Sequence, residues 1–323
     1  MEKEEILYNS FLKEIVQKVP QKTEVVKVLS NILSINREDV TRKLKGEESF
    51  TFYEIMTISG QLDISLDHLK MNGSLITEPF RMKLIEYINP VETDFALMEE
   101  MTAIMRSFNS NSDSEAAEIT NILPQPLYLP YKNITRFYLF KWKYQSNLNK
   151  AMPYKDVVLA DKLLKVQAEY VEWAKRLRAS YIFDHLLFHY LVADIRYFYS
   201  AGLMTREEVQ LIKQELLDIL DEIADLSNTG IFRETGKRVD IYISYVNVGT
   251  NYIYVSAPDY HLTIIKAFIL NGIATTDKRV SEELKLRVQS MKRQSTLITG
   301  SSEKERVGFL EEQRKVIESL SQL

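Results

Sequence analysis

The chain has 323 residues, of which 45% are hydrophobic and 27% charged, with 41 Lys and Arg against 45 Asp and Glu. This composition is typical of a folded globular protein, and the length is sufficient for two domains. The absence of cysteine excludes disulfides, thiolate nucleophiles and Cys-ligated metal sites. The first residues lack the pattern of a secretion signal, and charged residues interrupt the most apolar stretch, residues 181–199. We therefore expect a cytoplasmic protein without a membrane segment.

The first part of the chain predicts five short helices with few residues between them. Apolar residues recur at helical spacing over residues 4–19, 23–33, 37–45, 51–62 and 65–69. We expect Thr23 to cap the second helix, and one side of the fourth to carry Phe52, Ile55, Met56, Ser59 and Leu62. The Asn-Gly-Ser segment at 72–74 indicates a boundary, which places a first domain at residues 1–75.

The third helix has a recognisable start and end. Asn36 can accept a hydrogen bond from an unpaired N–H group of the first turn, and Gly46 permits the left-handed backbone that ends a helix. Only a tight turn separates Leu33, the last apolar residue of the second helix, from Asn36. Two short helices joined in this way form a helix-turn-helix, which presents its second helix to the DNA major groove.

The remaining residues, 76–323, predict a larger domain that is rich in helix. Helical patterns cover residues 79–88, 93–108, 134–144, 154–200 with a break near 179–180, 205–225, 281–292 and 302–320. Two of these helices have the Ser/Thr-x-x-Glu pattern of a capping box, beginning at Thr205 and at Ser302.

A change of period after residue 238 predicts strands. Residues 239–246 and 251–255 are β-branched and aromatic, and the four residues between them favour a β-hairpin. Residues 262–270 fit either a third strand or a buried helix. The expected fold class is therefore mainly α: a five-helix helix-turn-helix domain followed by an α-rich domain with a small antiparallel β-hairpin or sheet.

The helix-turn-helix carries a family resemblance. Its fourth helix leads to Asp-Ile-Ser-Leu-Asp-His-Leu at 63–69, and residues 29–69 resemble the phage-repressor family of lambda repressor and Cro. The whole chain is similar to bacterial helix-turn-helix transcription regulators. The resemblance implies a sequence-specific regulator that binds double-stranded DNA as a homodimer, with about Arg37–Lys45 as the recognition helix.

By position, the resemblance assigns a set of DNA-contacting residues: Asn36, Arg37, Glu38, Thr41, Arg42, Lys43 and Lys45. Arg37 and Arg42 can bind a guanine edge with two hydrogen bonds, and Glu38 can accept from cytosine. Thr41 can contact either of these two bases. Lys43 and Lys45 are expected on phosphates, which hold the protein on DNA without reading its sequence.

The chain departs from the family at the second helix. Val25, Val26 and Leu29-Ser30 occupy the region where the family has a Thr-Gln pair, so the phosphate-binding glutamine is missing. Residues 1–75 also carry ten Lys and Arg against twelve Asp and Glu, a formal charge of −2, whereas DNA-binding modules are usually basic. The alternative function is therefore a protein-interaction scaffold whose helix-turn-helix does not bind DNA.

A second basic region lies in the larger domain. Residues 119–155 contain no Asp or Glu, and aromatic residues alternate there with four candidate anion or effector contacts: Lys132, Arg136, Lys141 and Lys143. Such a mixture can hold an anionic small-molecule effector. The alternative is that the aromatic rings fill the core while the lysine stems extend outward. We expect the last two helices to supply the dimer contact.

No catalytic constellation is defined by spacing. His185 and His189 are four residues apart, as in some zinc sites, but the glutamate that follows the first histidine in metalloproteases is replaced by Leu186. No nucleophile elbow, P-loop or dinucleotide fingerprint occurs. The sequence therefore predicts a protein that is not an enzyme and has no metal or cofactor.

Overall fold

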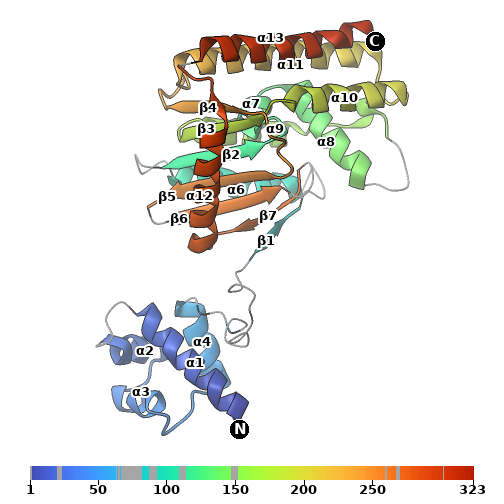
Figure 1. Cartoon of the computed structure of the whole chain (residues 1–323). Coiled ribbons are helices and arrows are strands. Elements are labelled where there is room, and N and C mark those ends of the chain that lie inside the picture. Colours follow the sequence, from blue (N-terminus) through green and yellow to red (C-terminus); the bar gives the residue numbers. More distant parts are fainter. Residues whose placement is uncertain are drawn as a thin grey trace. The chain divides into compact units, whose positions relative to one another are not determined.

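The structure is a computed structural model that describes most of the chain. The described residues are 2–19, 24–62, 64, 66, 82–86, 93–108, 114–146, 152–258, 260–266, 270–300 and 302–323. The chain divides into two compact units, Met1–Phe80 (unit 1) and Arg81–Leu323 (unit 2) (Figure 1). The Thr23 cap, the boundary at 72–74 and most of the predicted fifth helix lie outside the described residues.

Unit 1 contains four described helices around a small core. They are α1 (Glu2–Lys18), α2 (Val25–Leu33), α3 (Arg37–Leu44) and α4 (Phe52–Leu62). Their apolar sides meet in a cluster of nine buried residues that includes Phe11, Leu29, Val40 and Ile58. Four of the five predicted helices are thus present, and α2 packs against both α3 and α4.

The expected apolar side of α4 is wrong in part. Phe52 is 77% exposed and Met56 49% exposed, and Tyr53 between them is 78% exposed. The buried side of α4 contains Ser59, as expected, together with Ile58, and Ile55 and Leu62 pack against the same core. Spacing alone predicts which residues share a side of a helix, but it does not predict which side faces the core.

The described strands of unit 2 form one mixed eight-stranded sheet. The strands are β1 (Lys83–Ile85), β2 (Glu115–Thr120), β3 (Arg178–Asp184), β4 (Val239–Ser244), β5 (Asn251–Ala257), β6 (Tyr260–Lys266), β7 (Gly272–Thr275) and β8 (Thr296–Leu297). Their order is β1-β7-β6-β5-β2-β3-β4-β8. The pairs β2–β3 and β3–β4 are parallel, and the other pairs are antiparallel.

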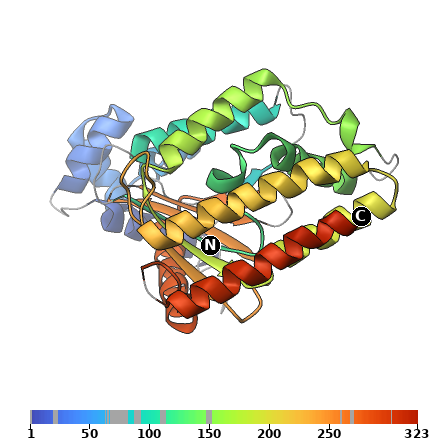
Figure 2. The same cartoon turned by 90° about the horizontal axis from the view of Figure 1, so that it is seen from above.

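Helices cover both faces of this sheet. They are α6 (Thr93–Phe108), α7 (Gln125–Tyr128), α8 (Lys132–Ser146), α9 (Asp161–Ala174), α10 (Leu187–Ser200), α11 (Arg206–Thr229), α12 (Lys278–Gln294) and α13 (Glu303–Glu318). The main core joins one face to every helix except α12, which packs across the other face on Ile182 and Tyr254. Figure 2 shows α13 running beside α11. Unit 2 is therefore an α/β layered fold.

This architecture overturns the expected fold class of mainly α with a small hairpin. Residues 83–85, expected within a helix, form strand β1, and β2 and β3 were not expected at all. Six consecutive residues of β3 are buried. A strand buried on both faces has no polar alternation, so periodicity does not separate it from a buried helix.

The predicted hairpin is also wrong. Strands β4 and β5 follow one another in the chain, but β3 and β2 lie between them in the sheet. Crossing three strand spacings requires about 14 Å, and the six residues 245–250 reach up to about 20 Å. The loop is held over the ends of β2 and β3 because Asn121 Nδ2 donates to the Val248 carbonyl (2.9 Å) and Asp184 accepts from the Val248 N–H (2.8 Å).

Of the two expected capping boxes, one forms. Thr205 accepts from the Glu208 N–H (3.3 Å), and Glu208 accepts from the Thr205 N–H (2.8 Å) at the start of α11. At α13, Ser302 adopts a left-handed backbone (φ 53°) and makes no side-chain cap. For residues 262–270 the sequence left a strand and a buried helix open, and residues 262–266 belong to strand β6.

Candidate nucleic-acid interface

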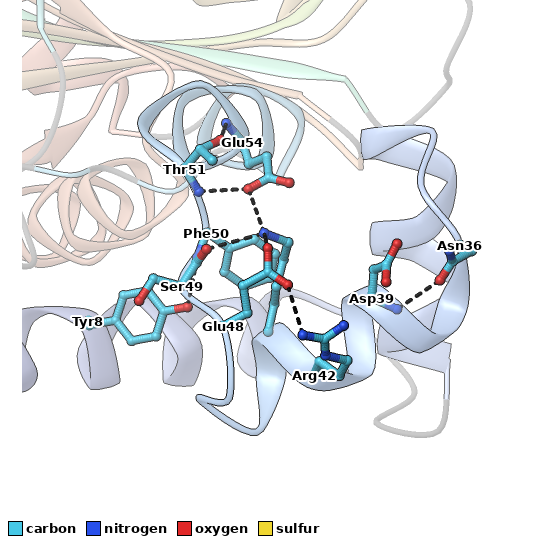
Figure 3. Close-up of polar contacts among 10 residues, drawn as sticks. Tyr8, Asn36, Asp39, Arg42, Glu48, Ser49, Phe50, Thr51 and Glu54 are labelled. Carbon is cyan, nitrogen blue, oxygen red and sulfur yellow. Dashed lines mark hydrogen bonds and ion pairs between the residues drawn. The ribbon is translucent and has the colours of Figure 1, made fainter.

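The turn between α2 and α3 has the geometry of a helix-turn-helix. Ser34 ends α2 in the left-handed region (φ 56°), and the Ser30 hydroxyl donates to the Ile35 carbonyl (2.6 Å). Asn36 begins α3 by accepting a hydrogen bond from the Asp39 N–H (2.8 Å) (Figure 3). The predicted cap is confirmed. These contacts fix the angle at which α3 leaves α2.

The outward side of α3 carries polar and charged residues. Arg37, Glu38, Arg42 and Lys45 are exposed, whereas Val40 is fully buried between the helices. Thr41 is half-buried and its hydroxyl donates to the Arg37 carbonyl (2.7 Å), so only its oxygen lone pairs face an incoming ligand. Three cations and one carboxylate therefore lie on a capped helix that is open to solvent.

Lys43, expected on phosphate, points into unit 1 instead. The residue is 4% exposed, and its ammonium group donates to Glu48 Oε1 (2.9 Å), Glu54 Oε2 (3.2 Å) and the Ser49 carbonyl (3.2 Å). Figure 3 shows these three acceptors around one point in the turn that joins α3 to α4. The residue lies one helical turn after buried Val40, so it shares the inward side of α3. Its side chain stabilises this turn and is not exposed for the phosphate contact that the sequence predicted.

A capping box that sequence reasoning missed completes this arrangement. Thr51 N–H donates to Glu54 Oε2 (2.6 Å), and the Glu54 N–H donates to Thr51 Oγ1 (3.3 Å). The Thr-x-x-Glu spacing before α4 was the available signal. Phe50 is held beside it, because its N–H donates to the Tyr8 hydroxyl (3.0 Å). The cap therefore joins α1, α3 and α4.

Lys43 and Glu54 stabilise each other in their charged forms. Burial disfavours the charged form of Lys43, but hydrogen bonds and attraction from Glu48 and Glu54 outweigh burial and raise its pKa. Burial likewise opposes the Glu54 carboxylate, yet the Thr51 N–H and the Lys43 ammonium lower its pKa. Arg42 makes only a longer, exposed contact with Glu48 (3.7 Å), so it exchanges partners at little cost.

The basic-aromatic stretch of unit 2 packs mostly into the core. Seven residues of α8 are buried, and Phe140 stacks edge-on with Phe198 at 4.7 Å and with Tyr154 at 5.7 Å. This arrangement favours the alternative in which the aromatic rings fill the interior.

The four candidate effector contacts do not form one cradle. Lys141 pairs with Asp194 of α10, and the Arg136 guanidinium lies 5.5 Å from the Tyr154 ring centroid. These two residues lie about 140° apart around α8. Lys132 is exposed and Lys143 is half-buried on the same helix.

The histidine pair makes separate polar contacts. His185 Nδ1 lies 3.5 Å from Asp184, and His189 Nε2 lies 3.9 Å from Glu312 of α13. Within the described part of the chain, no three His, Asp or Glu side chains converge as metal ligands would.

Comparisons with known proteins give no match. No family model matches the chain, and neither the curated proteins nor the solved structures yield a similar one. Among the helices that the structure describes, none combines the length and apolar character needed to cross a membrane. The likeness to phage repressors thus remains a prediction that rests on residues 29–69 alone.

Proposed function

We propose that this chain is a cytoplasmic, sequence-specific DNA-binding transcription regulator that acts as a homodimer. The observation that carries the proposal is α3: a helix capped by Asn36, joined to α2 by a tight turn, with Arg37, Arg42 and Lys45 exposed along its outer side. A helix presented in this way fits the major groove, where arginine reads guanine with two hydrogen bonds.

The exposed residues divide between base reading and phosphate binding. Arg37 and Glu38, in the first turn of α3, and Arg42, one turn later, are the proposed base contacts. Arg42 releases Glu48 when it meets DNA, since an exposed pair contributes at most about 1 kcal/mol. Lys45, at the end of α3, is the proposed phosphate contact, and Asn36 and Thr41 supply additional polar groups.

A module with this little positive charge requires a second copy to bind DNA tightly, because each neutralised phosphate adds to the affinity. The expected dimer source was the pair of terminal helices, but Phe309 and Ile317 of α13 are buried in the core of unit 2. The exposed group of Phe52, Tyr53 and Met56 on α4 is a better surface. Neighbouring exposed aromatic and apolar side chains are frequent at protein interfaces.

The test is a binding measurement on the full chain. Duplexes selected from a random library, and DNA upstream of its own operon, are titrated with the protein at several salt concentrations. We expect binding that weakens as salt rises, and we expect Arg37→Ala to lower affinity by about fivefold to 100-fold while relaxing the preference at one base pair. Lys13→Ala, which removes an exposed cation of α1, is the matched control and should change affinity little.

The second candidate function is the protein-interaction scaffold. It is favoured by the formal charge of −2 in residues 1–75 and by the use of Lys43 inside the unit. If no duplex binds in a salt-dependent manner, or if Arg37→Ala and Lys13→Ala have equal effects, the regulator proposal fails and the scaffold takes its place.

A further inference from the structure

An open cavity of about 250 Å³ lies at the surface of unit 2, between α6 and the antiparallel edge of the sheet. Its floor contains the buried side chains of Ile85 on β1, Leu262 on β6 and Ala274 on β7. Its opposite wall is the side of α6 that carries Leu97 and Met101.

Helix α6 packs mainly against α9 and contacts the sheet at fewer points, such as the Lys83–Glu100 ion pair. The two helices pack along their lengths, with the Arg106 guanidinium 5.5 Å from the Trp173 ring centroid and the Lys162 ammonium 3.7 Å from the Phe95 ring centroid. Among the described strands, β1 pairs with β7 alone, and it is three residues long. Helix α6, which is anchored mainly on α9, and the short edge strand β1 thus leave an apolar space between them.

The mouth of the cavity is polar but electrically balanced. Lys83 and Glu100 form an ion pair there, with both side chains at least half exposed. Tyr260, which is 39% exposed, and the exposed Thr276 also line the cavity. These groups offer hydrogen bonds to a ligand, and the paired charges favour neither an anion nor a cation.

We propose that this cavity binds a small uncharged amphiphile, with an aliphatic chain inside and a hydrogen-bonding head at the mouth. A 150 Å³ apolar cavity accommodates benzene, so 250 Å³ fits roughly ten non-hydrogen atoms. Methionine is flexible and polarisable, which allows Met82 and Met101 to adapt to an aliphatic chain. Binding at this site does not depend on the proposed DNA function.

The position of the cavity beside β1 indicates that a bound ligand stabilises this strand. β1 is the first strand after unit 1 in the chain, and it supplies Lys83 and Ile85 to the cavity. A bound chain buries apolar surface against β1 and stabilises its pairing with β7. An effect of the ligand on DNA affinity depends on the proposed DNA-binding function. The binding experiment is therefore carried out without DNA, so that its outcome does not depend on that function.

The experiment is calorimetric titration of the full chain with 1-alkanols of six to ten carbons. We expect affinity to rise about threefold to fourfold for each added methylene. Octanol should bind more tightly than octanoate or octylamine, because the mouth has no net charge. An affinity that does not change with chain length overturns the proposal, and so does tighter binding of either charged probe.

Two variants locate the site. Leu97→Trp fills the cavity and should abolish octanol binding, whereas the matched Leu211→Trp, at a position 55% exposed on α11, should leave it unchanged. Met101→Ala enlarges the cavity and should shift the preference toward longer alcohols. Equal binding by both Trp variants, or no shift with Met101→Ala, places the alcohol elsewhere and overturns the proposal.

Discussion

Helices α3 and α8 both combine basic residues with apolar ones, yet the structure uses them differently. On α3, Arg37, Arg42 and Lys45 are exposed, and only Val40 and Lys43 are buried. On α8, seven residues are buried, including Phe137, Phe140 and Trp142. Unit 1 has a small core that takes little from each helix, whereas the sheet and helices of unit 2 enclose a large core.

The difference shows how the size of the available core decides where basic and large apolar residues are placed. Aromatic rings bury large areas and are taken up wherever a large core is available, so the rings of α8 pack inward and its cations follow local partners such as Asp194. In unit 1 most polar residues of α3 stay outside, where they can meet ligands, and Lys43 is the exception. Exposed cations on a small capped helix are therefore the better indicator of a binding surface.

The largest effect is expected in the aromatic core of unit 2. Phe140→Ala removes a ring that is 1% exposed and packs against Phe198 and Tyr154, so the free energy of unfolding of unit 2 should fall by about 3–5 kcal/mol. Denaturant titration followed by tryptophan fluorescence measures the change. Val158→Ala, at a position 70% exposed, is the control and should cost far less. Equal losses would mean that α8 is not a core helix.

The next largest effect concerns the Lys43 cluster of unit 1. Lys43→Met keeps the aliphatic stem but leaves Glu54 without its cation, so unit 1 should lose roughly 2–3 kcal/mol of stability. Lys45→Met, which removes an exposed cation two residues later, should leave stability nearly unchanged and weaken DNA binding instead. The reverse pattern, with Lys45→Met the more destabilising change, would contradict the inward role of Lys43.

A smaller loss is expected at the start of α3. Asn36→Ala removes the acceptor of the Asp39 N–H and should lower the stability of unit 1 by about 1 kcal/mol. Asn36→Asp keeps a capping oxygen and should retain most of that stability. The free energy of unfolding of the two variants, measured side by side, decides whether the cap or the amide itself matters.

The smallest effect is a change in acid sensitivity. The pKa of Glu54 is lowered from 4.5 in the folded state, so its carboxylate contributes stability above about 4.5 that is lost as pH falls through the folded pKa. Glu54→Gln should therefore flatten the decline in stability of unit 1 between pH 5 and the acid limit, whereas Glu47→Gln should not. Parallel acid titrations of the unchanged protein and the two variants test this. Identical slopes would show that Glu54 does not contribute to the acid sensitivity of unit 1.

Much of unit 1 was predictable because its determinants are local. The Asn36 cap, the helix spacing and the exposed residues of α3 all depend on neighbours within a few positions. The inward turn of Lys43 was not predicted, because it depends on Glu48 and Glu54 after the next turn. Two local signals were available: the three-residue spacing of Lys43 from Val40 and the Thr51–Glu54 capping box.

In unit 2, the sequence by itself determined individual elements: α6, the capped start of α11, and the strands β4 and β5. Only the tertiary structure decided which strands are neighbours. β2 and β3 enter between β4 and β5 because parallel pairing joins residues far apart in the chain, and no short-range pattern records such a contact. The same long-range packing holds α6 against α9 and opens the cavity beside β1.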